Sequence, residues 1–114
     1  MDRLEAEIRA RGLNVFARID HSAGAAEVGL TLAPTELIIF GSARGGTRLM
    51  QSVQTVGIDL PLKALVWKDA SGTTWLSYNE PRWIAQRHGV ANKDAVLSNM
   101  SDMLSAMATK VANG

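Results

Sequence analysis

The sequence predicts an α+β fold, in which helices pack on a small mixed β-sheet within one domain spanning residues 1–114. Three observations lead to this prediction. Helix-like and strand-like patterns alternate through the first half of the chain, two strand-like segments flank a tight turn in the middle, and two helix-like segments follow. The expected element order is therefore α-β-α-β-α-β-β-α-α, and no linker, repeat or low-complexity segment interrupts it.

The chain opens with a helix pattern and a strand pattern. Residues 2–12 predict a helix, because Leu4 and Ile8 lie four positions apart and Gly12 is a typical C-terminal stop. Residues 13–20 alternate between apolar and other side chains, which is typical of a half-buried strand.

The next three elements surround a Gly-rich segment. An Ala-rich stretch over 21–30 predicts a short helix with Ser22 as its N-cap. The continuous apolar run 37–40 predicts a central strand covered on both faces. A helix is expected from Thr47 to about Val56.

The second half predicts a hairpin and two helices. Two β-rich arms flank the turn 69–72, and Trp67 should face Trp75 across them. Pro81 suits the first position of a short helix that Asn79 or Glu80 caps and that ends at His88. The last helix runs from a cap at Asn92 to about Ala112, and its Met-rich stripe is either core or a contact face for a second copy.

Composition excludes several classes of function. The formal net charge of +1 gives no electrostatic basis for binding nucleic acid or an acidic membrane surface. The sequence holds no cysteine, which excludes disulfides, thiol nucleophiles and Cys-ligated zinc. We expect a cytoplasmic location, although a leader removed upstream of Met1 would fit the same sequence. No apolar run approaches the roughly 20 residues of a transmembrane helix.

The segment from Gly41 to Arg48 has the glycine spacing of a phosphate-binding P-loop. Thr47 and Arg48 stand where that motif needs Lys followed by Ser or Thr, so we expect no nucleotide. Two interpretations remain. One is a tight strand-to-helix turn without a ligand, and the other is a small-anion site at the helix start, assisted by Arg44, Arg48 and the Thr47 hydroxyl.

The only two histidines, His21 and His88, lie at the ends of elements. Asp20 precedes His21 and could orient it as a general base, although neighbouring strand residues point to opposite faces. Capping or a surface hydrogen bond is the simpler role, and His88 can offset the negative end of its helix. Neither histidine has the spacing of a metal-binding motif, so no metal is expected.

Lys63 stands inside an apolar strand-like segment. A surface position or a salt bridge is the usual explanation, whereas a lysine facing a cleft could bind an anion or act as a tuned amine. Tyr78 and Asn79 end the second hairpin arm, where packing and helix capping are their simpler roles.

Four segments in series resemble the domain of unknown function 302 family: "RIDHSAGA", "PTELIIFGSARGGTRLMQ", "GIDLPLKALVWKD" and "WLSYNEPRWIAQRHG". The resemblance covers the chain from about Leu4. It implies a small bacterial-type α+β domain that forms homodimers and whose activity is not established. Members often carry Asn-Pro where this sequence has Ser42 and Ala43. They usually have a further N-terminal strand, without which a sheet edge would be open to a partner.

The resemblance also implies a shared pocket. The recurring polar positions of the family correspond here to Arg18, Asp20, His21, Gly41, Thr47, Asp59, Lys63, Tyr78, Asn79 and His88.

We therefore expect a homodimeric domain that binds a small anionic or polar molecule and needs no cofactor. The expected ligand-binding residues are Arg18, Asp20, His21, Gly41, Thr47, Arg48, Lys63, Tyr78 and Asn79. One alternative is an enzyme that uses His21, His88 or Lys63, although no nucleophile is evident. Another is a protein-interaction module whose contact face is the Met-rich last helix.

Overall fold

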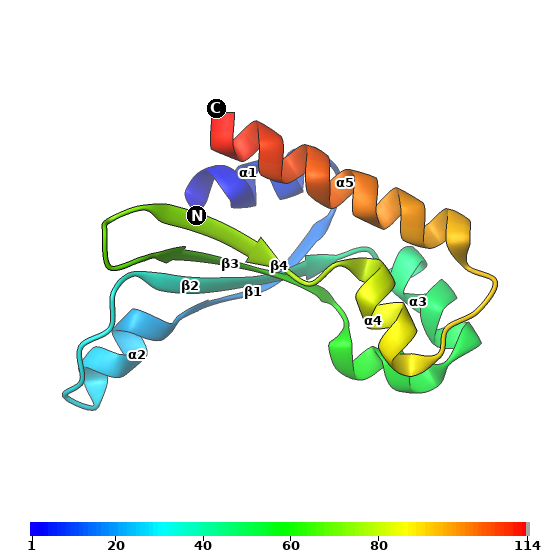
Figure 1. Cartoon of the computed structure of the whole chain (residues 1–114), viewed down its shortest axis with the longest axis horizontal. Helices are drawn as coiled ribbons and strands as arrows, with labels where there is room; N and C mark the ends of the chain where they lie inside the picture. The colour runs from blue at the N-terminus through cyan, green and yellow to red at the C-terminus, as the bar shows by residue number, and fades with distance from the viewer. Residues whose placement is uncertain (114) are drawn as a thin grey trace.

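The structure is a computed structural model that describes residues 1–113. Its elements run in the expected order, with one added 3-10 helix (Figure 1). They are α1 (Asp2–Ala10), β1 (Asn14–Asp20), α2 (His21–Glu27), β2 (Thr35–Gly41), α3 (Ala43–Ser52), η1 (Gln54–Asp59), β3 (Leu62–Lys68), β4 (Thr74–Tyr78), α4 (Pro81–His88) and α5 (Asp94–Asn113).

The four strands form one sheet in the order β1-β2-β3-β4, and each neighbouring pair is antiparallel. The α+β class is thus confirmed, but the sheet is not mixed as expected. The reason lies in the connections. α2 follows β1 and lies below one end of the sheet, and α3 with η1 lies at the other end, so neither crosses a face to start a parallel strand (Figure 1).

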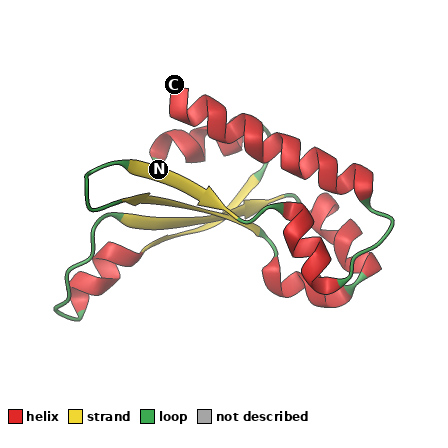
Figure 2. Cartoon of the chain, in the orientation of Figure 1, coloured by secondary structure: helices red, strands yellow, loops and turns green. Residues whose placement is uncertain are grey.

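One face of the sheet is covered by α1 and α5, which lie side by side above it (Figure 2). Ile38 and Phe40 of β2 point to this covered face and are completely buried. They pack with residues that the two helices and β3 contribute: Leu4, Ile8, Leu62, Ala64, Leu104 and Met107. The Met residues of α5 therefore serve the core, because Met107 is buried and Met103 packs beside it.

A second core lies at the α3 end of the sheet. It joins Leu49 of α3, Val56 of η1, Ile84 and Ala85 of α4, and Leu97 of α5. The length of α5 lets it serve both cores, and this fixes the position of α3 relative to the sheet.

The opposite face of the sheet, called here the open face, carries no helix along its length within residues 1–113 (Figure 1). The pairing register gives it Ala17, Ile19, Thr35, Leu37, Ile39, Lys63, Leu65, Trp67, Trp75 and Ser77, and Phe16, in the bulge between Val15 and Ala17, adds to it. Phe16 is 55% exposed and Trp75 50% exposed. The expectation that β2 is covered on both faces is therefore wrong, because nothing covers Leu37 and Ile39, which are only half-buried.

Three helix starts differ from the expectation. α5 begins at Asp94, so Asn92, the expected cap, lies two residues before the helix. Asp20, not Ser22, caps α2, because its carboxylate accepts hydrogen bonds from the Ala23 N–H at 3.0 Å and the Ser22 hydroxyl at 2.6 Å. α3 begins at Ala43 rather than Thr47, so Gly45 and Gly46 belong to its first turns.

The hairpin turn is organised around Asp69. Its carboxylate accepts hydrogen bonds from the Ser71 and Thr73 N–H groups at 2.9 and 3.0 Å, and from the Trp75 indole at 2.8 Å. Trp75 also stacks on Trp67 with ring centroids 6.2 Å apart, as expected. The Trp75 hydrogen bond, followed by those of Ser71 and Thr73, lowers the pKa of Asp69 to about 2.

Because this pKa lies below that of the unfolded chain, Asp69 stabilises the fold above about pH 4, and we expect that contribution to disappear as the pH falls towards 2. Asp69→Asn should lower the melting temperature at pH 6 and have a smaller effect at pH 2.5. Melting curves over this range test the prediction, with Asp102→Asn as a control at an exposed carboxylate of α5. An equal effect of Asp69→Asn at every pH would contradict it.

Candidate functional site

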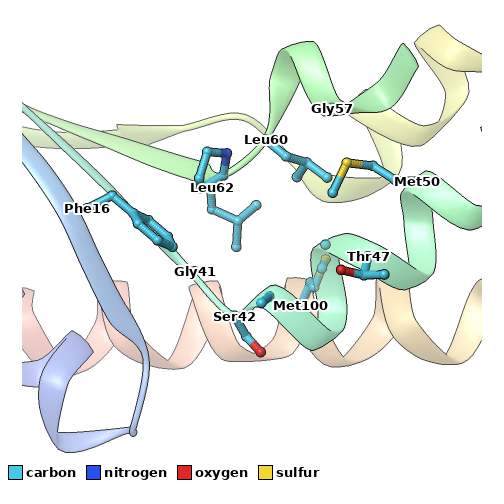
Figure 3. A pocket seen from close by; sticks show the side chains of 12 residues that line it. Phe16, Gly41, Ser42, Thr47, Met50, Gly57, Leu60, Leu62 and Met100 are labelled. Carbon is cyan, nitrogen blue, oxygen red and sulfur yellow. The ribbon is translucent and has the colours of Figure 1, made fainter. Parts of the chain in front are cut away.

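A pocket of about 200 Å³ lies where the open face meets α3 (Figure 3). Its walls come from several parts of the chain. β1 contributes Phe16, the β2–α3 turn contributes Gly41 and Ser42, α3 contributes Thr47 and Met50, and α5 contributes Met100. The remaining side is the segment 60–62 that leads into β3. The walls are apolar except at the α3 end.

The polar end of the pocket is the start of α3. Ser42 is the N-cap residue, and its hydroxyl makes no capping hydrogen bond. The first intrahelical bond runs from the Gly46 N–H to the Ser42 carbonyl at 3.1 Å, so the N–H groups of residues 43–45 have no partner within the helix. The first turn carries no acidic side chain. These N–H groups give the helix start a partial positive charge.

Two glycines of α3 lie close to side chains that line the pocket. A Cβ on Gly45 would lie 2.9 Å from the Met100 methyl group, so the Met100 side chain would have to shift. A Cβ on Gly46 would point towards the pocket, 3.7 Å from Leu60 and 3.8 Å from Met50. The Gly-rich segment is thus the first part of a helix and not an extended loop around a phosphate.

Three of the residues predicted for the site lie at or beside this pocket. Gly41 and Thr47 line it directly. Lys63 lies on the open face beside it, and its ammonium group donates a hydrogen bond to the Pro61 carbonyl at 3.0 Å. Pro61 itself lines the pocket. Arg48 lies on the exposed surface of α3, outside the lining.

The other predicted residues are dispersed over the molecule. Arg18 lies on the covered face, where its guanidinium pairs with Glu36, Asp2 and Glu5 at 2.8 to 3.1 Å. Asp20 caps α2, and His21 is an exposed residue of its first turn. Tyr78, on β4, packs against the core that contains Ile38 and Phe40, and Asn79, just after β4, is exposed.

A second polar cluster lies between η1 and α4. The His88 Nε2 is 2.5 Å from the Asp59 carboxylate, and its Nδ1 is 3.4 Å from the Thr55 hydroxyl. Arg87 also pairs with Asp59 at 3.3 Å. The His88 hydrogen bond is the largest cause that lowers the pKa of Asp59, and the charge of Arg87 adds to it.

Sequence reasoning found the members of this cluster only in part. The family resemblance pointed to Asp59 and His88 separately, but not to their contact across 29 positions of the chain. Thr55 gave no signal, because one hydroxyl in a polar segment is unremarkable. No group of three potential metal ligands gathers anywhere within residues 1–113.

We expect His88→Ala to raise the pKa of Asp59 towards its ordinary value, because the carboxylate loses its main hydrogen-bond donor. Carboxyl-detected NMR titration measures this pKa directly. His21→Ala is the matched control and should leave Asp59 unchanged, since His21 lies on α2. If the Asp59 pKa is the same in both variants, His88 does not stabilise its charged form.

Comparison with known proteins gives a consistent family. The family model described as "Domain of unknown function DUF302" matches residues 1–107. The fold matches the crystal structure of an uncharacterized conserved DUF302 protein from Bacillus stearothermophilus with a TM-score of 0.84 and 20% sequence identity. That superposition covers 95% of this chain and 84% of the other.

Curated relatives carry a different kind of name. The chain is 47% identical over 114 residues to proteins named fluoride-specific ion channel FluC 1 in Brucella suis and Brucella abortus. The matches take in 100% of this chain but only 45% and 42% of those proteins, so the chain spans less than half of their length. Within residues 1–113, no helix has the length and apolar character needed to cross a membrane.

The match to the family model extends over most of the chain, and the fold agrees with that of a solved member. The chain therefore belongs to the DUF302 family.

Proposed function

We propose that this protein is a homodimeric binding domain for a small molecule with one anionic group and a short apolar body. The observation that supports this most directly is the uncapped start of α3 at one end of an otherwise apolar pocket. Each part of the pocket suits a different part of such a ligand.

The anionic group would lie at the start of α3. Free N–H groups and the helix dipole together favour a carboxylate or a phosphate at this position. Ser42 and Thr47 add hydroxyls on the same side of the pocket, and α3 also carries Arg44 and Arg48 on its exposed surface. The absence of an acidic residue in the first turn leaves this place free for an anion from solution.

The apolar body of the ligand would lie against Phe16, Met50 and Met100. Methionine side chains adapt their shape to a ligand at little cost. The cavity of about 200 Å³ is smaller than the roughly 300–1,000 Å³ of sites for drug-sized molecules. Short-chain carboxylates and small phosphate esters are therefore the preferred ligand class.

The open face supports the proposed homodimer. Apolar side chains dominate that face, and Phe16 and Trp75 are about half exposed. Monomeric proteins seldom expose a continuous apolar patch of this kind. A second copy of the chain is the partner that we propose for it.

The name of the Brucella proteins suggests one further ligand to test, fluoride. The chain corresponds to less than half of each of those proteins, whose name describes them as whole molecules. Fluoride nevertheless belongs in any anion panel, because it is small and a helix start can hold an anion.

Gly46→Ala should separate ligand binding from folding. The added methyl group would enter the pocket at ordinary contact distance from Leu60 and Met50, so the fold should gain about 0.5–1 kcal/mol from the better helix former. The same methyl group should crowd the ligand and weaken binding about tenfold or more. Thermal-shift and calorimetric titrations with short carboxylates, phosphate esters, inorganic phosphate and fluoride measure both effects.

Gly24→Ala is the matched control, because Gly24 occupies the same fourth position in α2 and a Cβ there meets nothing within 4 Å. It should stabilise the protein without affecting binding. A panel in which no anion shifts the melting temperature of the native protein would reject the proposed ligand class. A ligand that binds Gly46→Ala as well as the native protein would place the site elsewhere.

The Asp59–His88–Thr55 cluster favours a second candidate function, an enzyme that uses His88 as a general base. With Asp59 on one ring nitrogen, the other can accept a proton from the Thr55 hydroxyl or from water. If so, His88→Gln should reduce turnover at least a hundredfold in a screen of ester and phosphoester substrates, and His21→Gln should not. No turnover by the native protein in such a screen would leave the binding domain as the better explanation.

A further inference from the structure

The open face and the pocket suggest how two copies fit together. We infer that each copy inserts the apolar segment after α2, residues 28–34, over the pocket of the other copy. This segment is called the arm below. The inference rests on the homodimer proposed above and adds that the site of each copy is incomplete without the other.

The arm has an unusual composition for a surface segment. It contains no charged residue, and Val28, Leu30 and Leu32 alternate along it. Their exposed fractions are 71%, 66% and 47%. Three large aliphatic side chains that point into solvent from one short segment are costly unless a partner covers them.

The arm and the pocket lie at opposite ends of the same side of the molecule. α2 and the arm extend below the sheet at one end, and α3 with η1 lies below it at the other (Figure 1). The molecule is 45 Å long, and the open face lies between these two ends. When two open faces pack against each other, a two-fold axis that lies between them at right angles to the long axis of the molecule exchanges the ends, so that each arm reaches the pocket of the other copy.

The area of the open face also favours a contribution of the arms to the interface. Strands of seven residues are about 23 Å long and four strands span about 19 Å, which gives a footprint of roughly 400 Å². A stable interface usually buries about 800 Å² on each copy. Apolar contacts beyond the sheet would enlarge the interface, and the exposed side chains of the arm are the ones that could provide them.

The charges favour a second copy over an anionic membrane. Among the open-face residues that the structure describes, only Lys63 is charged, and its ammonium group is engaged by the Pro61 carbonyl. Membrane-surface segments usually combine apolar residues with several basic ones, which this face lacks. A net charge of +1 means that two copies repel each other only weakly.

The absence of cysteine makes the arrangement testable by site-directed cross-linking. Leu30→Cys places one thiol on the arm, and Thr47→Cys places one beside the pocket on an exposed part of α3. The two single variants, carrying different tags, are co-expressed and treated with a short bis-maleimide. The expected product is a covalent heterodimer of Leu30→Cys with Thr47→Cys. Thr109→Cys, on the exposed surface of α5, is the control and should not cross-link to the arm.

Other products have distinct meanings. A predominant Leu30→Cys homodimer would show that the arms meet each other, which overturns the inference but keeps the proposed dimer. A protein that sediments as a monomer at micromolar concentration would overturn both. Leu30→Asp should weaken dimerisation about tenfold or more, and unchanged dimerisation of this variant would also overturn the inference. Ligand binding, measured by thermal shift on the native protein, is a separate result.

Discussion

The antiparallel pairing of neighbouring strands across the four-stranded sheet is the constraint on which the other features depend. Because side chains alternate along each strand and partners across the sheet share a face, the register fixes which residues meet. It places Ile38 and Phe40 under α1 and α5, and leaves Leu37, Ile39 and Trp67 on the other side. The helices at the two ends then convert this one-sided sheet into a molecule with a protruding arm and a pocket on its uncovered side.

Local sequence patterns predicted most of the fold because they report local physics. Gly12, Pro81 and the turn at Asp69 mark element ends, and the Trp67–Trp75 pair follows from hairpin register. The mixed sheet was wrong because strand direction depends on where a connection lies, which no local pattern records. The prediction that both faces of β2 are covered was also wrong. A run of four apolar residues has the same pattern whether a helix of the same chain or a second molecule covers its outer face.

The site was predictable only in part, because its residues meet through long-range packing. Gly41 and Thr47 carried a signal, since glycine spacing before a helix is a local feature. Met100 lies on the last helix and reaches the pocket through the packing of α5 beside α3, which no local pattern records. Arg18 was expected at the site only because of the family resemblance. It lies on the covered face, away from the pocket, and α1 supplies two of its three carboxylate partners.

If each arm covers the pocket of the other copy, ligand binding and dimerisation share the same surface and must be coupled. A ligand that binds more tightly when the arm covers it will strengthen dimerisation. By linkage, the factor by which the ligand increases the dimerisation constant equals the factor by which dimerisation increases the affinity for the ligand. Phe16 belongs both to the open face and to the pocket wall, so it connects the two events physically. A domain built in this way would couple the concentration of a small anion to its own association.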